Sequence, residues 1–166
     1  KYNVVGEYGY VEIKEKDFDK EIKLILKDND LVGLNITMPF KEKIIPHLRT
    51  VSFGMSKNAD APLSQSAEKI GAVNWISRAN TNWIGNNSDW SGFEKSLKVF
   101  DVANKEKRNI AIVIGYGGVS KAIIYSLYSV GYKKIKLFNR SYEKIKNKFV
   151  NTPYDHSVET HKLGEL

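Results

Sequence analysis

Three polar side chains in the stretch "LVGLNITMPFKEK" have the chemistry of a site that binds and transforms a small polar molecule. Asn35 and Thr37 are two positions apart on an expected strand, so both would point to one face and contact the same ligand. Lys41 follows at the expected start of the next helix, and a positioned lysine can take or give a proton. Asn74 in "GAVN" and Asp89 in "NNSDWSGF" would add polar groups at strand or helix ends.

A glycine turn further along the chain has the pattern of a phosphate-binding site. The stretch "IAIVIGYGGVSKA" places Gly115, Gly117 and Gly118 between an apolar strand and a helix that begins at about Val119. Glycines permit a tight turn and close backbone approach, while a helix N-terminus offers unpaired N–H groups to an anion. Because Ser120 replaces the third glycine of the dinucleotide pattern, the match is partial, and a glycine-rich loop that binds nothing is the alternative.

The residues after the next expected strand, in "FNRSYEK", bear on which dinucleotide would bind. NAD sites usually carry an acidic residue here for the ribose hydroxyl, whereas NADP sites need donors for the extra phosphate. Asn139, Arg140, Ser141 and Lys144 supply donors, and no acid occurs before Glu143. The sequence therefore favours NADP, the alternative being that Arg140 and Lys144 are ordinary surface charges.

Two successive α/β regions are expected to position these side chains. In the first, "GYVEIK" and "VGLNITM" have strand patterns, and "AVNWIS" with "TNWIGN" predicts a hairpin. Helices are expected over 17–28, in "DWSGFEKSLKVF" and in "KEKIIPHL", which Pro46 should disturb. Residues 50–65 should be a loop. The polar segment "VANKEKRN" marks an expected boundary between a substrate domain at 1–100 and a cofactor domain at 101–166.

The second region has the pattern of a parallel sheet. The apolar run "IAIVIG", an amphipathic helix and the strand "IKLFN" make one βαβ unit, and another helix should start after it. The final segment, "NTPYDHSVETHKLGEL", is interpreted as a loop or tail. The predicted fold class is α/β, with a Rossmann-type domain that is incomplete and whose sheet edges would be exposed.

Composition narrows the classes of protein and site. The 166 residues are 42% hydrophobic and 27% charged, which is typical of a globular protein. The absence of cysteine and the spacing of the three histidines argue against metal catalysis, so no metal is expected. No apolar run or leader pattern suggests a membrane span or export, so we expect a cytoplasmic protein. The net charge of +7 suits an anionic partner, but the lysines mostly alternate with acids or apolar residues along helices, and no RNA-binding pattern occurs.

Five motifs in order resemble the shikimate dehydrogenase family: "NITMPFK", "IGAVN", "GNNSDWSGF", "VIGYGGVSKA" and "FNRS". The family patterns run approximately N-V-T-x-P-F-K, G-A-V-N-T, N-T-D-x-x-G, G-A-G-G-A-x-R and N-R-T. The resemblance covers roughly residues 5–150. It implies NADP-dependent, reversible reduction of 3-dehydroshikimate to shikimate on two α/β domains that flank a cleft.

The resemblance also implies roles for individual residues. Lys41 and Asp89 match the catalytic pair, and Asn35, Thr37 and Asn74 match the residues that bind the substrate. The glycine turn would hold the pyrophosphate. The expected cofactor-binding residues are Gly115, Gly117, Gly118, Val119, Asn139, Arg140, Ser141 and Lys144.

Several departures from the family keep alternatives open. The family's N-terminal serine pair and its C-terminal strands have no counterpart here, which suggests a partial chain. Tyr116 replaces a small residue in the glycine turn, where it would crowd the cofactor or stack on it. A non-catalytic NADP-binding module and an NAD-using quinate or shikimate dehydrogenase are the alternatives, together with a weakly supported nucleic-acid binder. The oligomeric state is left open, with a homodimer among the options.

Overall fold

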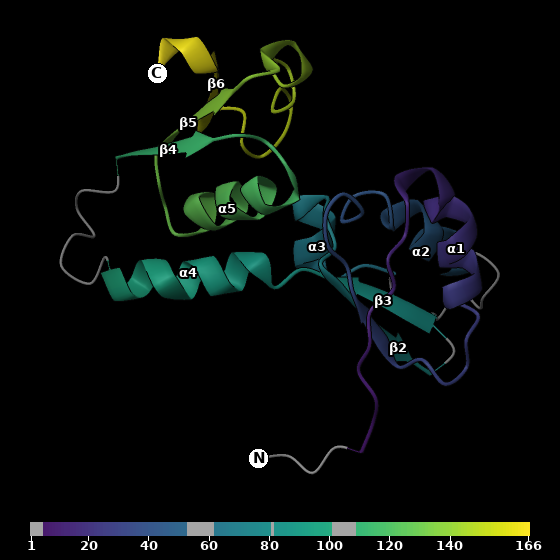
Figure 1. The fold of residues 1–166 in the computed structure, drawn as a ribbon. Coiled ribbons are helices and arrows are strands. Elements are labelled where there is room, and N and C mark those ends of the chain that lie inside the picture. The colour runs from purple at the N-terminus through teal and green to yellow at the C-terminus, as the bar shows by residue number, and fades with distance from the viewer. Residues whose placement is uncertain (1–4, 53–61, 81, 101–108) are drawn as a thin grey trace.

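The computed structural model describes residues 5–52, 62–80, 82–100 and 109–166. Within these residues the chain forms two separate three-stranded sheets, each with helices against it (Figure 1). Mixed helices and strands confirm the predicted α/β class. Most of the segment expected to separate two domains lies outside the described residues. Among the described helices, none has the length and apolar character needed to cross a membrane.

The first sheet is antiparallel, in the order β1 (Gly33–Asn35), β2 (Trp75–Ala79) and β3 (Asn82–Asn86). Strands β2 and β3 form the predicted hairpin. Three helices accompany this sheet: α1 (Phe18–Ile25), after a short 3-10 turn at Glu15–Asp17, α2 (Ile45–Ser52) and α3 (Gln65–Ile70).

The core of this region lies between the sheet and its helices. Burial alternates along β3, and the Trp83 indole, 2% exposed, donates a hydrogen bond of 2.9 Å to the Leu26 carbonyl. At Gly85 a Cβ atom would lie 2.7 Å from Leu48 and 2.8 Å from Leu63. Glycine at this position therefore lets these two leucines pack directly on the strand.

The second sheet is parallel, in the order β4 (Ile110–Ile114), β5 (Lys134–Asn139) and β6 (Val158–Lys162). Helix α5 (Gly118–Ser129) connects β4 to β5, as the βαβ pattern predicts. Its buried residues pack with the inward side chains of the three strands. The side chains of Ile110, Ile112 and Ile114 are more than half exposed, so one face of β4 is uncovered in the described structure.

Helix α4 (Asp89–Phe100) follows β3 of the first sheet and runs alongside α5, which packs on the second sheet (Figure 1). The contact between these two helices joins the two regions. The rings of Trp90 and Tyr125 meet edge to face with centroids 5.4 Å apart. The Ser126 hydroxyl donates a hydrogen bond of 2.8 Å to the Trp90 carbonyl. Through these contacts the start of α4, which follows the first sheet, lies against the helix that follows the glycine turn.

Three expectations for the first region are wrong. Residues 9–14 have a strand pattern but pair with none of the described strands, and all except Ile13 are exposed. Pro46 lies in the first turn of α2 rather than disturbing it, since proline fits the start of a helix, where backbone N–H groups have no helical acceptor. The loop expected over 50–65 contains the end of α2 and the first residue of α3, and 53–61 lie outside the described residues.

Two expectations for the second region are also wrong. After β5 the chain forms only a 3-10 turn, Tyr142–Lys144, and further turns rather than a regular helix. The final segment is not a tail, because it contains β6 and a closing 3-10 turn at Leu163–Glu165. Strand β6 pairs along its whole length with β5, from Val158 opposite Ile135 onward. This pairing makes β5 the central strand of the sheet.

Candidate active site

An ion pair between Lys41 and Asp89 is the centre of the candidate site. The Lys41 Nζ lies 2.8 Å from the Asp89 Oδ2, and the two side chains are 13% and 25% exposed. Asp89 is the first residue of α4, while Lys41 lies in turns between β1 and α2. The expectation that Lys41 begins a helix is therefore wrong, since α2 starts at Ile45. The Lys41 carbonyl accepts a 2.7 Å hydrogen bond from the Val73 N–H, which fixes this turn beside β2.

Asn74 joins this pair through the other carboxylate oxygen. Its Nδ2 donates hydrogen bonds to the Asp89 Oδ1 at 2.9 Å and to the Ser88 hydroxyl at 3.0 Å. The Ser88 N–H in turn donates to the Asn74 Oδ1 at 2.9 Å. Both oxygens of Asp89 are thus engaged, one by an ammonium and one by an amide, so its carboxylate has a defined orientation.

Asn87 is a further member of this network that the sequence interpretation missed. Its side chain is only 4% exposed, with Nδ2 donating to the Ala72 carbonyl at 2.9 Å and Oδ1 accepting from the Asp89 N–H at 3.0 Å. Asparagine commonly bonds the backbone two residues ahead in turns. The position of Asn87 two residues before Asp89 was therefore an available signal for this role.

Asn35 and Thr37 lie apart from the ion pair in their hydrogen bonding. Both side chains are exposed and flank the buried Ile36, so they do share one side of the chain. However, β1 ends at Asn35, and Thr37 lies beyond the strand. The Asn35 Nδ2 donates to the Tyr8 hydroxyl at 2.9 Å. In the described part of the chain, no hydrogen bond links either residue to Lys41 or Asp89.

The glycine turn lies directly against Lys41. A Cβ atom on Gly118 would be 3.3 Å from both the Cβ and the Cδ of Lys41, so a glycine there leaves room for the lysine stem. Gly115 has a positive φ of 89°, which glycine adopts without steric cost. Gly117 caps α5 with extended backbone, and Val119 in the first turn of α5 is 46% exposed. A helix N-terminus with these features can accept a phosphate.

A second contact ties the same two regions together. The Lys121 Nζ lies 2.6 Å from the Glu42 Oε2, so the residue after Lys41 pairs with the first turn of α5. Lys121 also lies over the Tyr116 ring, with Nζ 5.5 Å from the centroid. The candidate catalytic pair and the glycine turn therefore lie on adjoining surfaces.

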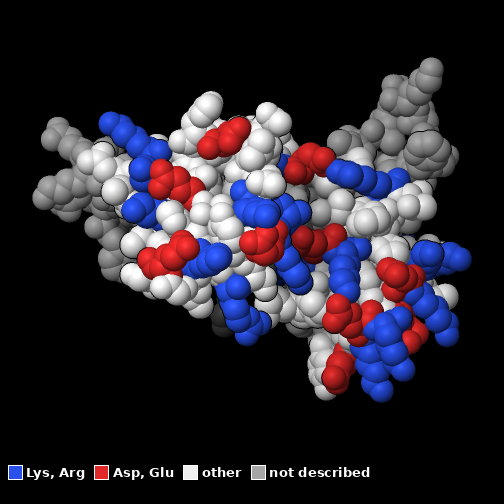
Figure 2. All heavy atoms as spheres, turned by 90° about the horizontal axis from the view of Figure 1, so that it is seen from above, with Lys and Arg blue, Asp and Glu red and all other residues white. Residues whose placement is uncertain are grey.

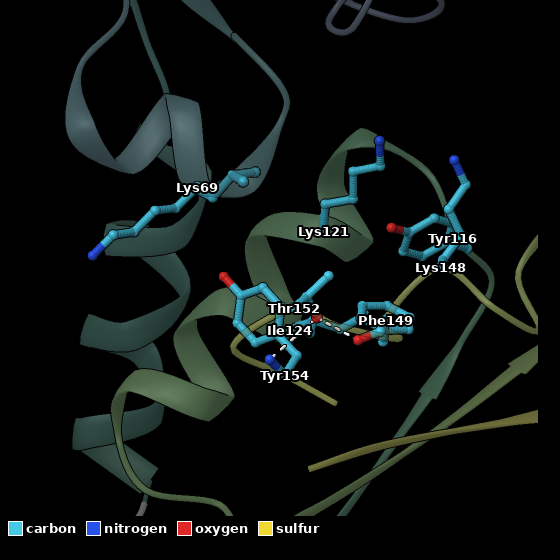
Figure 3. Close-up of a pocket in the computed structure, with 9 residues that line it drawn as sticks. Lys69, Tyr116, Lys121, Ile124, Lys148, Phe149, Thr152 and Tyr154 are labelled. Carbon is cyan, nitrogen blue, oxygen red and sulfur yellow. Dashed lines mark hydrogen bonds between the residues drawn. The ribbon is translucent and has the colours of Figure 1, made fainter. Parts of the chain in front are cut away.

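Tyr116 packs inward beneath the glycine turn. Its ring meets Phe149 at 72° with centroids 5.7 Å apart, beside a small cavity of about 140 Å³ (Figure 3). Burial, and to a lesser extent the charge of Glu42, raises the pKa of the Tyr116 phenol. Burial likewise raises the pKa of Tyr154, on the far side of this cavity, to about 12. The Tyr116 ring therefore packs against the core of the second region and helps to hold the glycine turn in place.

The expected phosphate-binding residues after β5 are only partly gathered. Arg140 and Ser141 line a surface hollow of about 450 Å³ at the ends of β5 and β6. Asn139 ends β5 and is not among the residues that line this hollow. Lys144, in the following 3-10 turn, is exposed and does not line the hollow either. The space-filling view shows basic side chains intermixed with acidic ones rather than gathered in one patch (Figure 2).

The chain is similar in sequence to proteins of one known family. Residues 1–76 match the model of the shikimate dehydrogenase substrate binding domain. The chain is 33% identical over 144 residues to shikimate dehydrogenase (NADP(+)) of Caldicellulosiruptor saccharolyticus, which covers 86% of this chain and 47% of that protein. The chain spans about half the length of this relative and of shikimate dehydrogenase (NADP(+)) of Caldicellulosiruptor bescii.

Solved structures give the same result. The crystal structure of shikimate dehydrogenase from Aquifex aeolicus matches with a TM-score of 0.69 at 33% identity, covering 90% of this chain and 49% of that one. Shikimate 5-dehydrogenase from Listeria monocytogenes, in complex with shikimate and NAD, matches with a TM-score of 0.67 at 25% identity, covering 93% and 50%. The resemblance to this family is confirmed.

Proposed function

We propose that this chain, a relative of the shikimate dehydrogenases, carries the catalytic residues of an NADP-dependent enzyme that interconverts 3-dehydroshikimate and shikimate. The observation that carries the proposal is the Lys41–Asp89 ion pair at 2.8 Å, beside the glycine turn. A protein that only binds nucleotide has no need for a poised lysine and carboxylate at this place. The activity named for the relatives supports the choice of substrate.

Lys41 would handle the proton of the reaction. Reduction of a ketone by hydride places negative charge on the carbonyl oxygen, and an ammonium within hydrogen-bond reach donates the proton that neutralises it. In the reverse direction the amine accepts the proton of the alcohol. Asp89 holds Lys41 Nζ in place, and Asn74 holds Asp89. Asn35 and Thr37, exposed on one side of the chain, would bind hydroxyl groups of the substrate.

The residues present fit an NADP cofactor. The turn from Gly115 to Val119 would hold the pyrophosphate, because Gly115 has positive φ and the first N–H groups of α5 lack helical partners. Arg140 and Ser141 would hold the 2′-phosphate, with Asn139 and Lys144 beside them. When bound, NADPH supplies the hydride. We extend the proposal to two domains at 1–100 and 101–166, the second of Rossmann type, because β4, α5 and β5 form its βαβ unit.

NAD use is the second candidate for the cofactor. The Listeria monocytogenes structure was solved with shikimate and NAD, so a related site accepts NAD. Against it, β5 ends in Asn139 rather than the acidic residue usual for the ribose hydroxyl of NAD. Measurement with both cofactors decides between them.

The proposal is tested by following reduced-nicotinamide absorbance in the natural full-length protein while shikimate is added with NADP, and separately with NAD. We expect shikimate-dependent reduction of NADP and a rate at least about 100-fold lower for Lys41→Ala. Lys43→Ala is the matched control, because Lys43 is exposed and pairs with Glu15 rather than with Asp89.

Two results would overturn the proposal. If shikimate causes no reduction of either cofactor in the wild-type protein, a non-catalytic binding module becomes the better interpretation. Full activity of Lys41→Ala would remove the lysine from the mechanism. A cytoplasmic location and a homodimer remain predictions from the sequence.

A further inference from the structure

The hollow at the carboxyl ends of β5 and β6 contains a cation that the sequence motifs do not include. Besides Arg140 and Ser141, it is lined by Lys162, the last residue of β6. In the sheet register Lys162 is the partner of Asn139, the last residue of β5. Since parallel strands present their carboxyl ends at one edge, Arg140 and Lys162 are brought to the same edge from different strands.

We propose that Lys162 is a specificity-determining residue that binds the 2′-phosphate of NADP together with Arg140 and Ser141. This inference rests on the proposed use of a dinucleotide by this protein. It concerns a position that lies outside the "FNRS" motif and within a segment that the sequence pattern assigned to a tail.

The charge balance of the hollow favours an anion. In the described structure neither Arg140 nor Lys162 forms an ion pair, so both charges are available. The Lys162 Nζ lies 6.0 Å from the centroid of the Tyr142 ring, and both residues line the hollow. A phosphate monoester carries close to two negative charges at neutral pH, and guanidinium and ammonium groups are its usual partners.

Two carboxylates near this edge are already engaged. Glu143, which also lines the hollow, is bonded by Lys146, and that hydrogen bond is the main cause of its lowered pKa. Glu165 accepts a 3.1 Å hydrogen bond from the Lys162 backbone N–H and lies 3.7 Å from the His161 Nδ1. The charge of Lys162 also contributes to lowering the Glu143 pKa, but less than Lys146 does, and no ion pair joins the Lys162 ammonium to either acid in the described structure.

The residue at position 139 also bears on the choice between NADP and NAD. NAD carries a ribose hydroxyl where NADP carries the phosphate, and a hydroxyl gains little from two cations. Asn139 offers no carboxylate to accept that hydroxyl. We therefore expect Lys162 to affect the affinity for NADP and to leave the affinity for NAD nearly unchanged.

The test is a calorimetric titration of the full-length protein with NADP and with NAD, using wild type, Lys162→Gln and the control Lys133→Gln. Lys133 is an exposed lysine next to the opposite end of β5, so its substitution removes the same charge from the other edge of the sheet. For Lys162→Gln we expect the dissociation constant of NADP to rise about tenfold and that of NAD to change less than about twofold. Lys133→Gln should change neither beyond about twofold.

Fragments of the cofactor separate this inference from the proposed activity. Adenosine 2′,5′-bisphosphate and adenosine 5′-monophosphate are titrated in the same way, and only the first should weaken in Lys162→Gln. If the wild type binds NADP but Lys162→Gln binds it equally well, or loses NAD affinity to the same extent, the role of Lys162 is refuted while the dehydrogenase proposal stands. If the wild type binds no NADP, both proposals fail.

Discussion

The Lys41–Asp89 network and the hollow at the ends of β5 and β6 are built in opposite ways. In the network each charged or amide group is already bonded to another, from Lys41 through Asp89 to Asn74. In the hollow, Arg140 and Lys162 have no ion-pair partner among the described residues. A site that moves a proton needs its groups held in place before the reaction, whereas a phosphate brings its own charge to order the side chains that bind it.

Mutation should therefore affect the two regions differently. Substitutions in the network should impair both catalysis and stability, because its hydrogen bonds belong to the folded protein itself. Substitutions in the hollow should impair only cofactor binding.

Asp89→Asn should give the largest loss. The amide keeps the shape of the side chain and can still accept from Asn74, but it removes the charge that holds the Lys41 Nζ at 2.8 Å. We expect kcat for shikimate oxidation to fall about 100- to 1000-fold, with the KM for NADP changed less than about threefold. Asp19→Asn, at an exposed carboxylate on α1, is the control. Near-normal kcat in Asp89→Asn would show that the ion pair does not orient the lysine.

Asn87→Ala should lower stability, and Arg140→Ala should not. Removal of the buried Asn87 side chain leaves the Ala72 carbonyl and the Asp89 N–H without their partners. The expected decrease in the free energy of unfolding is about 1–3 kcal/mol, measured by denaturant titration. For Arg140→Ala a change below about 0.5 kcal/mol is expected, since the side chain is exposed and forms no ion pair with the described residues. Equal effects of the two substitutions would break the contrast between the regions.

Gly118→Ala tests the surface where the two regions adjoin. The added methyl group would lie 3.3 Å from two carbons of Lys41, so either the lysine stem or the start of α5 must shift. We expect a decrease of about 1 kcal/mol in stability, seen as a thermal midpoint lowered by about 2–4 °C. Gly9→Ala is the control for stability, because nothing in the described structure lies within 4 Å of the Cβ that it would add and Gly9 caps no described helix. A control that melts as early as Gly118→Ala would remove the steric explanation.

Much of the scaffold was predictable from the sequence, because its signals are local. The hairpin of β2 and β3 and the βαβ unit around α5 follow from alternation and from a continuous apolar run. Helix α3 was missed although Ser64 accepts a capping hydrogen bond from the Ala67 N–H, and serine is a favoured residue at the start of a helix. The signal for this helix is therefore local and present in the sequence.

Other features could not be predicted, because they depend on distant partners. Strand β6 is short and carries charged residues, and its conformation is stabilised by pairing with β5. Residues 9–14 show the reverse, a strand pattern with no partner among the described strands. The lysine and aspartate were singled out from their motifs, but their 2.8 Å contact and the inclusion of Lys162 in the hollow required the folded chain. Motifs identify residue types, and tertiary pairing decides which of them meet.

The salt concentration should affect the KM for NADP and leave kcat nearly unchanged. Exposed cations that bind a phosphate are screened by dissolved ions, whereas the Lys41–Asp89 pair is largely buried and is screened less. Raising the salt concentration from about 0.05 M to about 0.5 M should therefore raise the KM for NADP several-fold and change kcat at saturating NADP by less than about twofold. Steady-state kinetics at four salt concentrations, with Lys162→Gln in parallel, provide the measurement. The slope of log KM against log salt should be shallower in the variant, because one fewer cation meets the phosphate, and an unchanged slope would place Lys162 outside the contact.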